Sequence, residues 1–265
     1  MDNRPIGFFD SGLGGLTSIT CLKEIMPEEK VIFYGDTART PYGSKSPDTI
    51  RTFSKQIVEY LISQNVKLIV IACNTATSMA LEMLREEFPN IPIVGVIDPT
   101  VRKVVSDSPK SVGIIGTKAT ISSNIYIDTL RKYNPRIKTA SLACPAFVPL
   151  IEEGIIDNQI MDLTIKYYMD DFVMKGDFDS LILGCTHYPL IKENINRIYP
   201  DLRLYNSSLE VIMDVKKILT EENMLAQKND SKDIYYASDL SENFIKMTDK
   251  MLKNNDKNIK LIKFE

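Results

Sequence analysis

The chain has 265 residues, of which 44% are hydrophobic and 25% are charged, and its formal net charge is −3. This composition is typical of a globular protein, and the small net charge gives no indication of a nucleic-acid partner. No segment approaches the ~20 apolar residues of a membrane span, and the N-terminus lacks a signal-peptide pattern, so we expect a cytoplasmic protein with no membrane partner.

Short apolar runs alternate with segments of helical period along the chain. We predict strands at residues 5–10, 30–34, 66–72, 91–97, 111–115, 137–143, 179–184 and 202–205. A helix with Leu16, Ile19 and Leu22 on one face follows the first strand. Ser46 and Pro47 begin a second helix as its N-cap and first residue. This alternation predicts an α/β fold with mostly parallel sheets flanked by helices.

The segments that begin at Leu68 and Leu181 share one plan. Each is a strand that ends at a cysteine, Cys73 or Cys185, followed by a polar loop, a helix and a proline before the next strand. This internal similarity predicts two pseudo-symmetric lobes with a cleft between them. We expect residues 1–97 and 208–265 to form lobe 1 and residues 98–207 to form lobe 2, because the tail follows the last strand of the second half.

Polar side chains follow the predicted strands, at the edge where ligands bind in open α/β sheets. They are Asp10, Ser11, Cys73, Asn74, Thr75, Thr117, Thr120, Cys185, Thr186 and His187. Each also has an ordinary structural interpretation as a turn, a helix cap or a buried polar residue. Together they define the candidate site.

Two of the four cysteines are candidates for chemistry. We interpret Cys21 and Cys144 as buried thiols, whereas Cys73 and Cys185 precede helices, whose N-terminal dipole lowers the pKa of a thiol. Two thiols on opposite sides of a cleft suit stereoinversion, in which one removes an α-proton and the other returns a proton to the opposite face.

Each thiol needs a neighbour that manages its proton. We expect Asp10 to serve Cys73, and His187, with Glu152, to serve Cys185. The developing enediolate also needs stabilisation, for which the amides at the helix N-termini and nearby side chains are candidates. These side chains are Asn74, Thr75 and Thr186.

Other chemistries are weighed against this one. A metal site is not expected, because the chain has one histidine and no C-x-x-C pattern. A Cys–His hydrolase would use Cys185 and His187 but leaves Cys73 unexplained. A nucleotide-binding module is a third possibility, with Asp36 as ribose ligand, although Thr17 stands where the G-x-G-x-x-G pattern needs a small residue.

Six motifs occur in order over essentially the whole chain: GFFDSGLGGLT, YGDTARTPYG, ACNTATS, GVIDP, LACPAFVPLIEEG and LGCTHYPL. Together they resemble the glutamate racemases of the cofactor-independent aspartate/glutamate racemase superfamily. The resemblance implies interconversion of L- and D-glutamate between two α/β lobes, with Cys73 and Cys185 as alternating acid and base. It also implies D-glutamate supply for peptidoglycan synthesis, no cofactor or metal, and a homodimer.

The resemblance also implies roles for individual residues. Asp10, Glu152 and His187 would assist proton transfer, although Glu153 is an alternative to Glu152. Substrate would be bound by Asp10, Ser11, Tyr42, Gly43, Asn74, Thr75, Thr117, Thr186 and His187. An aspartate racemase, or another two-cysteine racemase of the superfamily, is the alternative activity.

Overall fold

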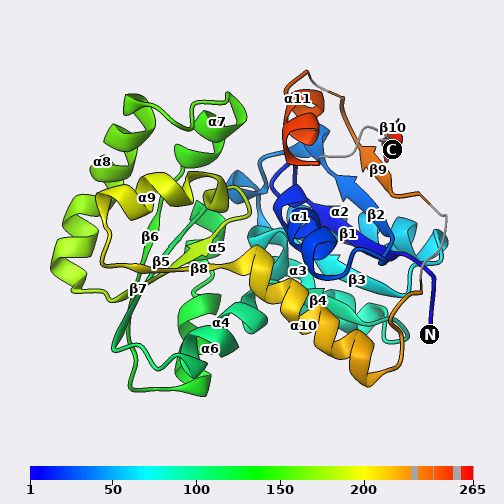
Figure 1. Ribbon diagram of the computed structural model, residues 1–265, viewed down its shortest axis with the longest axis horizontal. Coiled ribbons are helices and arrows are strands. Elements are labelled where there is room, and N and C mark those ends of the chain that lie inside the picture. The colour runs from blue at the N-terminus through cyan, green and yellow to red at the C-terminus, as the bar shows by residue number, and fades with distance from the viewer. Residues whose placement is uncertain (228–231, 241, 253–257, 265) are drawn as a thin grey trace.

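The structure is a computed structural model that describes residues 1–227, 232–240, 242–252 and 258–264. One sheet contains β1 (Ile6–Asp10), β2 (Val31–Gly35), β3 (Leu68–Ile71), β4 (Ile93–Gly95), β9 (Ile234–Ala237) and β10 (Asn258–Leu261). A second sheet contains β5 (Ser111–Gly116), β6 (Lys138–Ala143), β7 (Ser180–Gly184) and β8 (Arg203–Asn206). We refer to the first sheet with its helices as lobe 1, at the right of Figure 1, and to the second as lobe 2.

The strand order is β10-β9-β2-β1-β3-β4 in lobe 1 and β6-β5-β7-β8 in lobe 2. The strand pairs within the described chain are parallel. The order β2-β1-β3-β4 in lobe 1 therefore matches β6-β5-β7-β8 in lobe 2, and β9 and β10 extend lobe 1 beyond β2. The predicted α/β fold with two similar lobes is confirmed.

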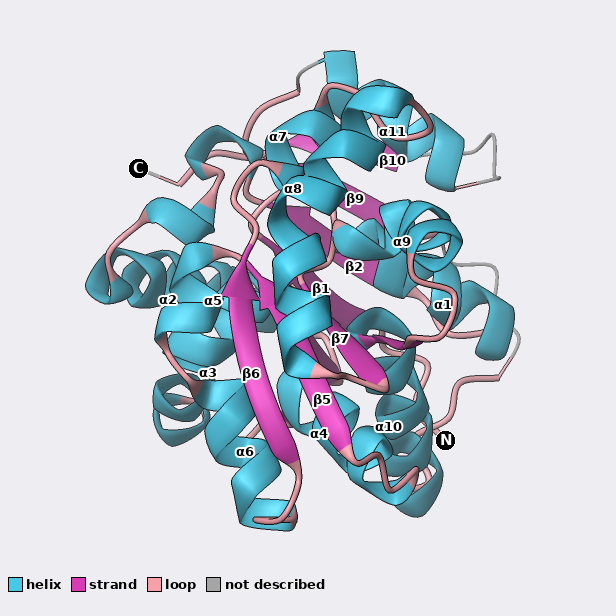
Figure 2. Cartoon of the chain, turned by 90° about the vertical axis from the view of Figure 1, so that its left-hand side faces the viewer, coloured by secondary structure: helices cyan, strands magenta, loops and turns pink. Residues whose placement is uncertain are grey.

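In each lobe, helices cover the faces of the sheet. The longer helices are α1 (Leu16–Ile25), α2 (Pro47–Ser63), α3 (Asn74–Glu87), α4 (Ile97–Ser106), α6 (Ile125–Tyr133), α8 (Gln159–Gly176), α10 (Ser207–Glu221) and α11 (Glu242–Met251). The shorter ones are α5 (Lys118–Ser122), α7 (Phe147–Glu152) and α9 (Lys192–Ile198). In Figure 2, where lobe 2 faces the viewer, α8 lies in front of the lobe 2 strands.

Three apolar cores hold these layers together. One core joins lobe 1 to α2 and α3, and another joins lobe 2 to α7, α8 and α9. The largest lies between the two sheets and contains side chains from α1, α4, α6 and α10 as well as from strands of both lobes. The lobes therefore share a core and do not merely touch.

Most predicted elements are found, with different limits. Ser46 caps α2, because its Oγ accepts a hydrogen bond from the Thr49 backbone N–H at 3.3 Å. The strand predicted at 91–97 is too long, because β4 ends at Gly95 and α4 begins at Ile97. Pro99 is accommodated there because the first turn of a helix needs no backbone N–H.

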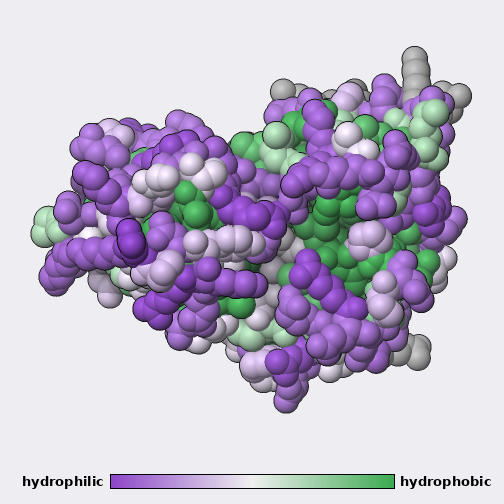
Figure 3. All heavy atoms as spheres, turned by 90° about the horizontal axis from the view of Figure 1, so that it is seen from below, coloured by the Kyte–Doolittle hydropathy of each residue, from purple (hydrophilic) through white to green (hydrophobic). Residues whose placement is uncertain are grey.

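The surface carries mostly polar side chains. Seen from below in Figure 3, hydrophilic residues cover most of the face, and apolar residues gather in a recess of lobe 1 at the right. Within the part of the chain that the structure describes, no helix combines the length and the apolar character that crossing a bilayer requires.

Candidate active site

Loops from both lobes meet around one small cavity. Both Cys73 and Cys185 line it, as do all the predicted substrate-binding residues except Asp10. Thr40, Pro41 and Val148 also line it, and the sequence reasoning did not single them out. Only the motif that contains Tyr42 could have drawn attention to Thr40 and Pro41, since apolar or loop residues carry no chemical signal of their own.

Cys73 is the N-cap of α3, directly after β3. Its Sγ accepts a hydrogen bond from the Ala76 backbone N–H at 3.4 Å and lies 3.5 Å from the Ser11 Oγ. Burial, reinforced by the charge of Asp10, raises the pKa of the Cys73 thiol to about 12. The lowering expected from the helix dipole is therefore wrong for the unliganded protein, because loss of solvent outweighs the dipole.

Cys185 follows β7, the strand of lobe 2 that corresponds to β3. Its Sγ lies 3.9 Å from His187 Nδ1, and His187 Nε2 lies 3.1 Å from the Glu152 Oε1. Burial lowers the pKa of His187, but the hydrogen bonds with Cys185 and Glu152 outweigh it and raise that pKa to about 10. The imidazole is thus poised between a thiol and a carboxylate, and it is Glu152 rather than Glu153 that makes this contact.

Asp10 is fully buried and does not line the cavity. Its carboxylate accepts hydrogen bonds from the Gly12 backbone N–H at 3.0 Å and from the Thr186 Oγ1 at 3.2 Å. Burial raises the pKa of Asp10, while the charge of His187 and the backbone donors oppose that shift. Its charge acts on Cys73, but its side-chain hydrogen bond crosses to the loop that carries Cys185.

Threonine hydroxyls and the backbone of Gly43 form another wall of the cavity. The Thr75 Oγ1 of lobe 1 lies 2.9 Å from the Thr117 Oγ1 of lobe 2. A Cβ on Gly43 would lie 2.7 Å from the Thr117 Cβ, so only glycine fits at this position. Tyr42 also lines the cavity, and its hydroxyl donates to the buried Asp36 carboxylate.

Similarity to known proteins extends over most of the chain. Residues 19–211 match the model of the Asp/Glu/hydantoin racemase family. The chain belongs to this family. It is an amino-acid racemase, as the sequence predicts. A glutamate racemase from Sulfurihydrogenibium sp. (strain YO3AOP1) is 49% identical over 216 residues, which cover 81% of this chain and 82% of that relative.

Two solved structures share the whole architecture. The glutamate racemase of Francisella tularensis subsp. tularensis SCHU S4, in complex with D-glutamate, has a TM-score of 0.93 and 39% identity over 99% of this chain and 98% of that one. The glutamate racemase isoform RacE1 of Bacillus anthracis has a TM-score of 0.94 and 30% identity over 100% of this chain and 99% of that one. The likeness therefore extends over both lobes.

The glycine-rich loop of this racemase is closely surrounded by other side chains. A Cβ on Gly14 would lie 2.7 Å from His187 Nδ1 and closer still to the Thr186 Oγ1. A Cβ on Gly15 would lie 2.6 Å from the Asp10 Cβ. Gly14 thus allows the loop to pack against the Cys185–His187 loop of lobe 2, and Gly15 allows it to pack against β1 of its own lobe.

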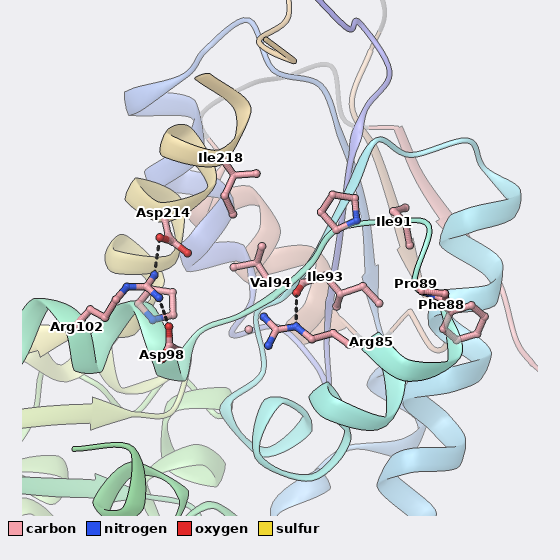
Figure 4. Close-up of a pocket in the computed structure, with 13 residues that line it drawn as sticks. Arg85, Phe88, Pro89, Ile91, Ile93, Val94, Asp98, Arg102, Asp214 and Ile218 are labelled. Atoms are coloured by element: carbon pink, nitrogen blue, oxygen red, sulfur yellow. Dashed lines mark hydrogen bonds and ion pairs between the residues drawn. The ribbon is translucent and has the colours of Figure 1, made fainter. Parts of the chain in front are cut away.

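The racemase also has a larger cavity, which lies between β4, α4 and α10 (Figure 4). It holds about 400 Å³, against about 20 Å³ for the cavity at the cysteines. Its cations already have partners, because Arg102 donates to Asp98 and Asp214, and Arg85 donates to the Ile93 carbonyl (Figure 4). Its lining contains the carboxylates of Asp98 and Asp214 but neither cysteine nor histidine, so it does not match the two-thiol site that the sequence predicts.

Proposed function

We propose that this racemase interconverts L- and D-glutamate by proton transfer between Cys73 and Cys185. The carrying observation is that these two buried thiols follow corresponding strands of two similar sheets and line one cavity. The names of the relatives support glutamate as the substrate.

In each direction one cysteine acts as a thiolate and the other as a thiol. The thiolate takes the α-proton, the electron pair of that C–H bond passes into an enediolate, and the opposite thiol gives its proton to the other face of the carbon. The negative charge has then moved from one sulfur to the other. The ammonium group of the substrate would favour the thiolate, because a nearby positive charge lowers the pKa of a buried thiol.

The surrounding groups suit these steps. The carboxylate of Asp10 lies near Cys73, and the His187–Glu152 pair connects Cys185 to a carboxylate whose side chain is 26% exposed. Donors that can stabilise the enediolate come from Ser11, Asn74, Thr75, Thr117 and Thr186, and from the backbone at Tyr42 and Gly43. His187 and Asp10 complete the proposed substrate-binding set.

Substrate binding requires this cavity to widen. The cavity of about 20 Å³ has room for about one water molecule, since one water needs about 10–15 Å³. Glutamate is far larger, so the described conformation corresponds to a closed cleft.

The wider biological role forms part of the same proposal. D-Glutamate would be supplied for peptidoglycan synthesis in the cytoplasm, without cofactor or metal, by a homodimer. Lobe 1 would comprise residues 1–97 and 208–265, and lobe 2 residues 98–207. The parallel pairing of β9 with β2 supports the return of the tail to lobe 1.

The decisive experiment follows the α-hydrogen of glutamate in deuterium oxide with a chelator present. Each pure enantiomer is expected to lose optical activity and to acquire deuterium at the α-carbon. Unchanged optical rotation of glutamate, together with turnover of aspartate, would instead support the aspartate racemase alternative.

Replacing either thiol tests the two-base mechanism. Cys73→Ser and Cys185→Ser are each expected to lower kcat for racemisation by at least about 10²-fold, because one face of the carbon loses its proton carrier. Cys21→Ser, at a half-buried thiol in α1, is the control. Full activity in either active-site variant would contradict the mechanism.

A further inference from the structure

Tyr126 reaches from lobe 2 to a residue of the candidate site in lobe 1. It lies on α6, is 3% exposed, and its hydroxyl donates a hydrogen bond to the Asn74 Oδ1 at 2.6 Å. Asn74 directly follows Cys73 and lines the cavity between the lobes. The sequence carries no sign of this contact, because 52 residues separate its partners.

The distances define which way the Asn74 amide points. A separation of 2.6 Å is usual for an O–H···O hydrogen bond but short for one that involves N–H, so the amide oxygen faces Tyr126. On the other side, the Asn74 Nδ2 donates to the Ser207 Oγ at 3.3 Å. An amide nitrogen carries two hydrogens, so one remains for the cavity that Asn74 lines.

Neighbouring hydroxyl groups keep the donors and acceptors around the Asn74 amide in fixed roles. Burial raises the pKa of Tyr126, so the phenol stays neutral and retains the proton that it donates. The Ser207 hydroxyl donates to the Leu183 carbonyl at 3.4 Å, which leaves the Ser207 oxygen free to accept from Asn74. Thr100, also close to the phenol, donates its own proton to the Val96 carbonyl at 2.6 Å.

We infer that Tyr126 is a positioning residue of the racemase, which acts by fixing the Asn74 amide with its N–H toward the substrate. The inference rests on the proposed function, in which the reacting group is a carboxylate that becomes an enediolate. An N–H donor stabilises that negative charge, whereas a rotated amide would present an oxygen and repel it. The bond also joins α6 of lobe 2 to the N-terminus of α3 in lobe 1.

A double-mutant cycle tests the inference with the full-length enzyme. Tyr126→Phe is expected to lower kcat/KM for both glutamate enantiomers by about tenfold, since one hydrogen bond is worth roughly that factor. In the Asn74→Ala background the same change is expected to alter kcat/KM by less than about twofold, because Tyr126 acts through Asn74. Equal losses in both backgrounds would overturn the inference.

Tyr205→Phe is the matched control. Tyr205 is also a lobe 2 tyrosine that is 3% exposed, and its hydroxyl donates to Asp107 at 3.1 Å, away from the cavity. It is expected to leave kcat/KM within about twofold. If Tyr126→Phe unfolds too readily to assay, Ser207→Ala provides a second test, because it removes the oxygen that accepts from the Asn74 Nδ2. Ser207→Ala is expected to show the same non-additivity with Asn74→Ala.

A second measurement needs no substrate and so separates this inference from the proposed function. In the ¹⁵N-labelled protein, the side-chain amide signal of Asn74 is identified by its loss in Asn74→Ala. That signal is expected to shift in Tyr126→Phe and to stay in place in Tyr205→Phe. An unmoved signal in Tyr126→Phe would overturn the inference even if the protein racemises glutamate, and a wild-type protein inactive on glutamate would leave this result standing.

Discussion

At the residue scale, His187 offers a direct test of the electrostatics, because it is the only histidine in the chain. Burial lowers its pKa, but Cys185 and Glu152 raise the net value to about 10, above the roughly 6.5 of an unfolded chain. Its contribution to stability is therefore full below about pH 6.5 and is lost as the pH rises through about 10. We expect the imidazole NMR signal to titrate near pH 10.

The partner of His187 can be tested with the same signal. Glu152→Gln is expected to lower the pKa of His187, because the carboxylate 3.1 Å away stabilises the imidazolium. The adjacent, exposed Glu153 provides the control, and Glu153→Gln should leave the titration unchanged. A wild-type titration near 6.5, or equal shifts in the two variants, would contradict this electrostatic account.

Gly14 tests the close approach of the two lobes. Gly14→Ala would bring a methyl group within 2.7 Å of His187 Nδ1 and closer to Thr186, so that loop must move. We expect kcat/KM to fall by about 10²-fold, since a displacement of about 1 Å at a reacting group has that effect. At Gly12 the nearest atom would be the Thr40 Oγ1 at 3.3 Å, so Gly12→Ala should be milder. Equal losses would argue against steric displacement.

At the scale of elements, a buried ion pair joins segments that are distant in the sequence. Lys67, just before β3, pairs with Glu29, just before β2, at 2.7 Å, and both side chains are at most 2% exposed. The Lys67 Nζ also donates to the carbonyls of Asp2 and Met224, each at 2.7 Å. This cluster attaches the N-terminal segment and the segment that follows α10 to the lobe 1 sheet.

Removing one member of the pair leaves a buried, unpaired charge. Lys67→Met is expected to lower the free energy of unfolding by about 3–5 kcal/mol, measured by urea denaturation. The double variant Lys67→Met with Glu29→Leu removes both charges and should recover much of that loss. A double variant less stable than Lys67→Met alone would show that the ion pair is not the main contribution. Activity of the folded fraction should not change, because the pair lies away from the cavity.

At the scale of the whole molecule, the shared core predicts cooperative unfolding of both lobes. The core between the sheets contains Phe8 of lobe 1 and Ile114 of lobe 2 together with α4 and α10, so neither lobe can unfold without exposing the other. The chain has no tryptophan, so a single one can report on each lobe. Phe88→Trp in lobe 1 and Tyr168→Trp in lobe 2 are expected to give the same denaturation midpoint. Two separate midpoints would show independent lobes.

Local patterns in the sequence predicted much of the fold and of the site. The apolar runs that became β1, β3, β5 and β7 are buried on both faces, so they show as continuous hydrophobic segments. Ser46 and Pro47 marked the start of α2 because capping is a local interaction. Cys73 and Cys185 were recognisable because each follows such a strand and lies within a motif, and the same holds for Asn74, Thr186 and His187.

The tertiary structure alone decided what depends on distance in space. It placed Asp10 against Thr186 of the other lobe, brought Tyr126 to Asn74, and added Val148 to the cavity wall. It also reversed the expected pKa shift of Cys73, because desolvation depends on the atoms that surround the thiol and not on its position before a helix. The sequence thus determined the main elements and most of the candidate residues, since secondary structure and motifs are local. Packing of the two lobes determined their partners and their protonation, because both depend on contacts between distant segments.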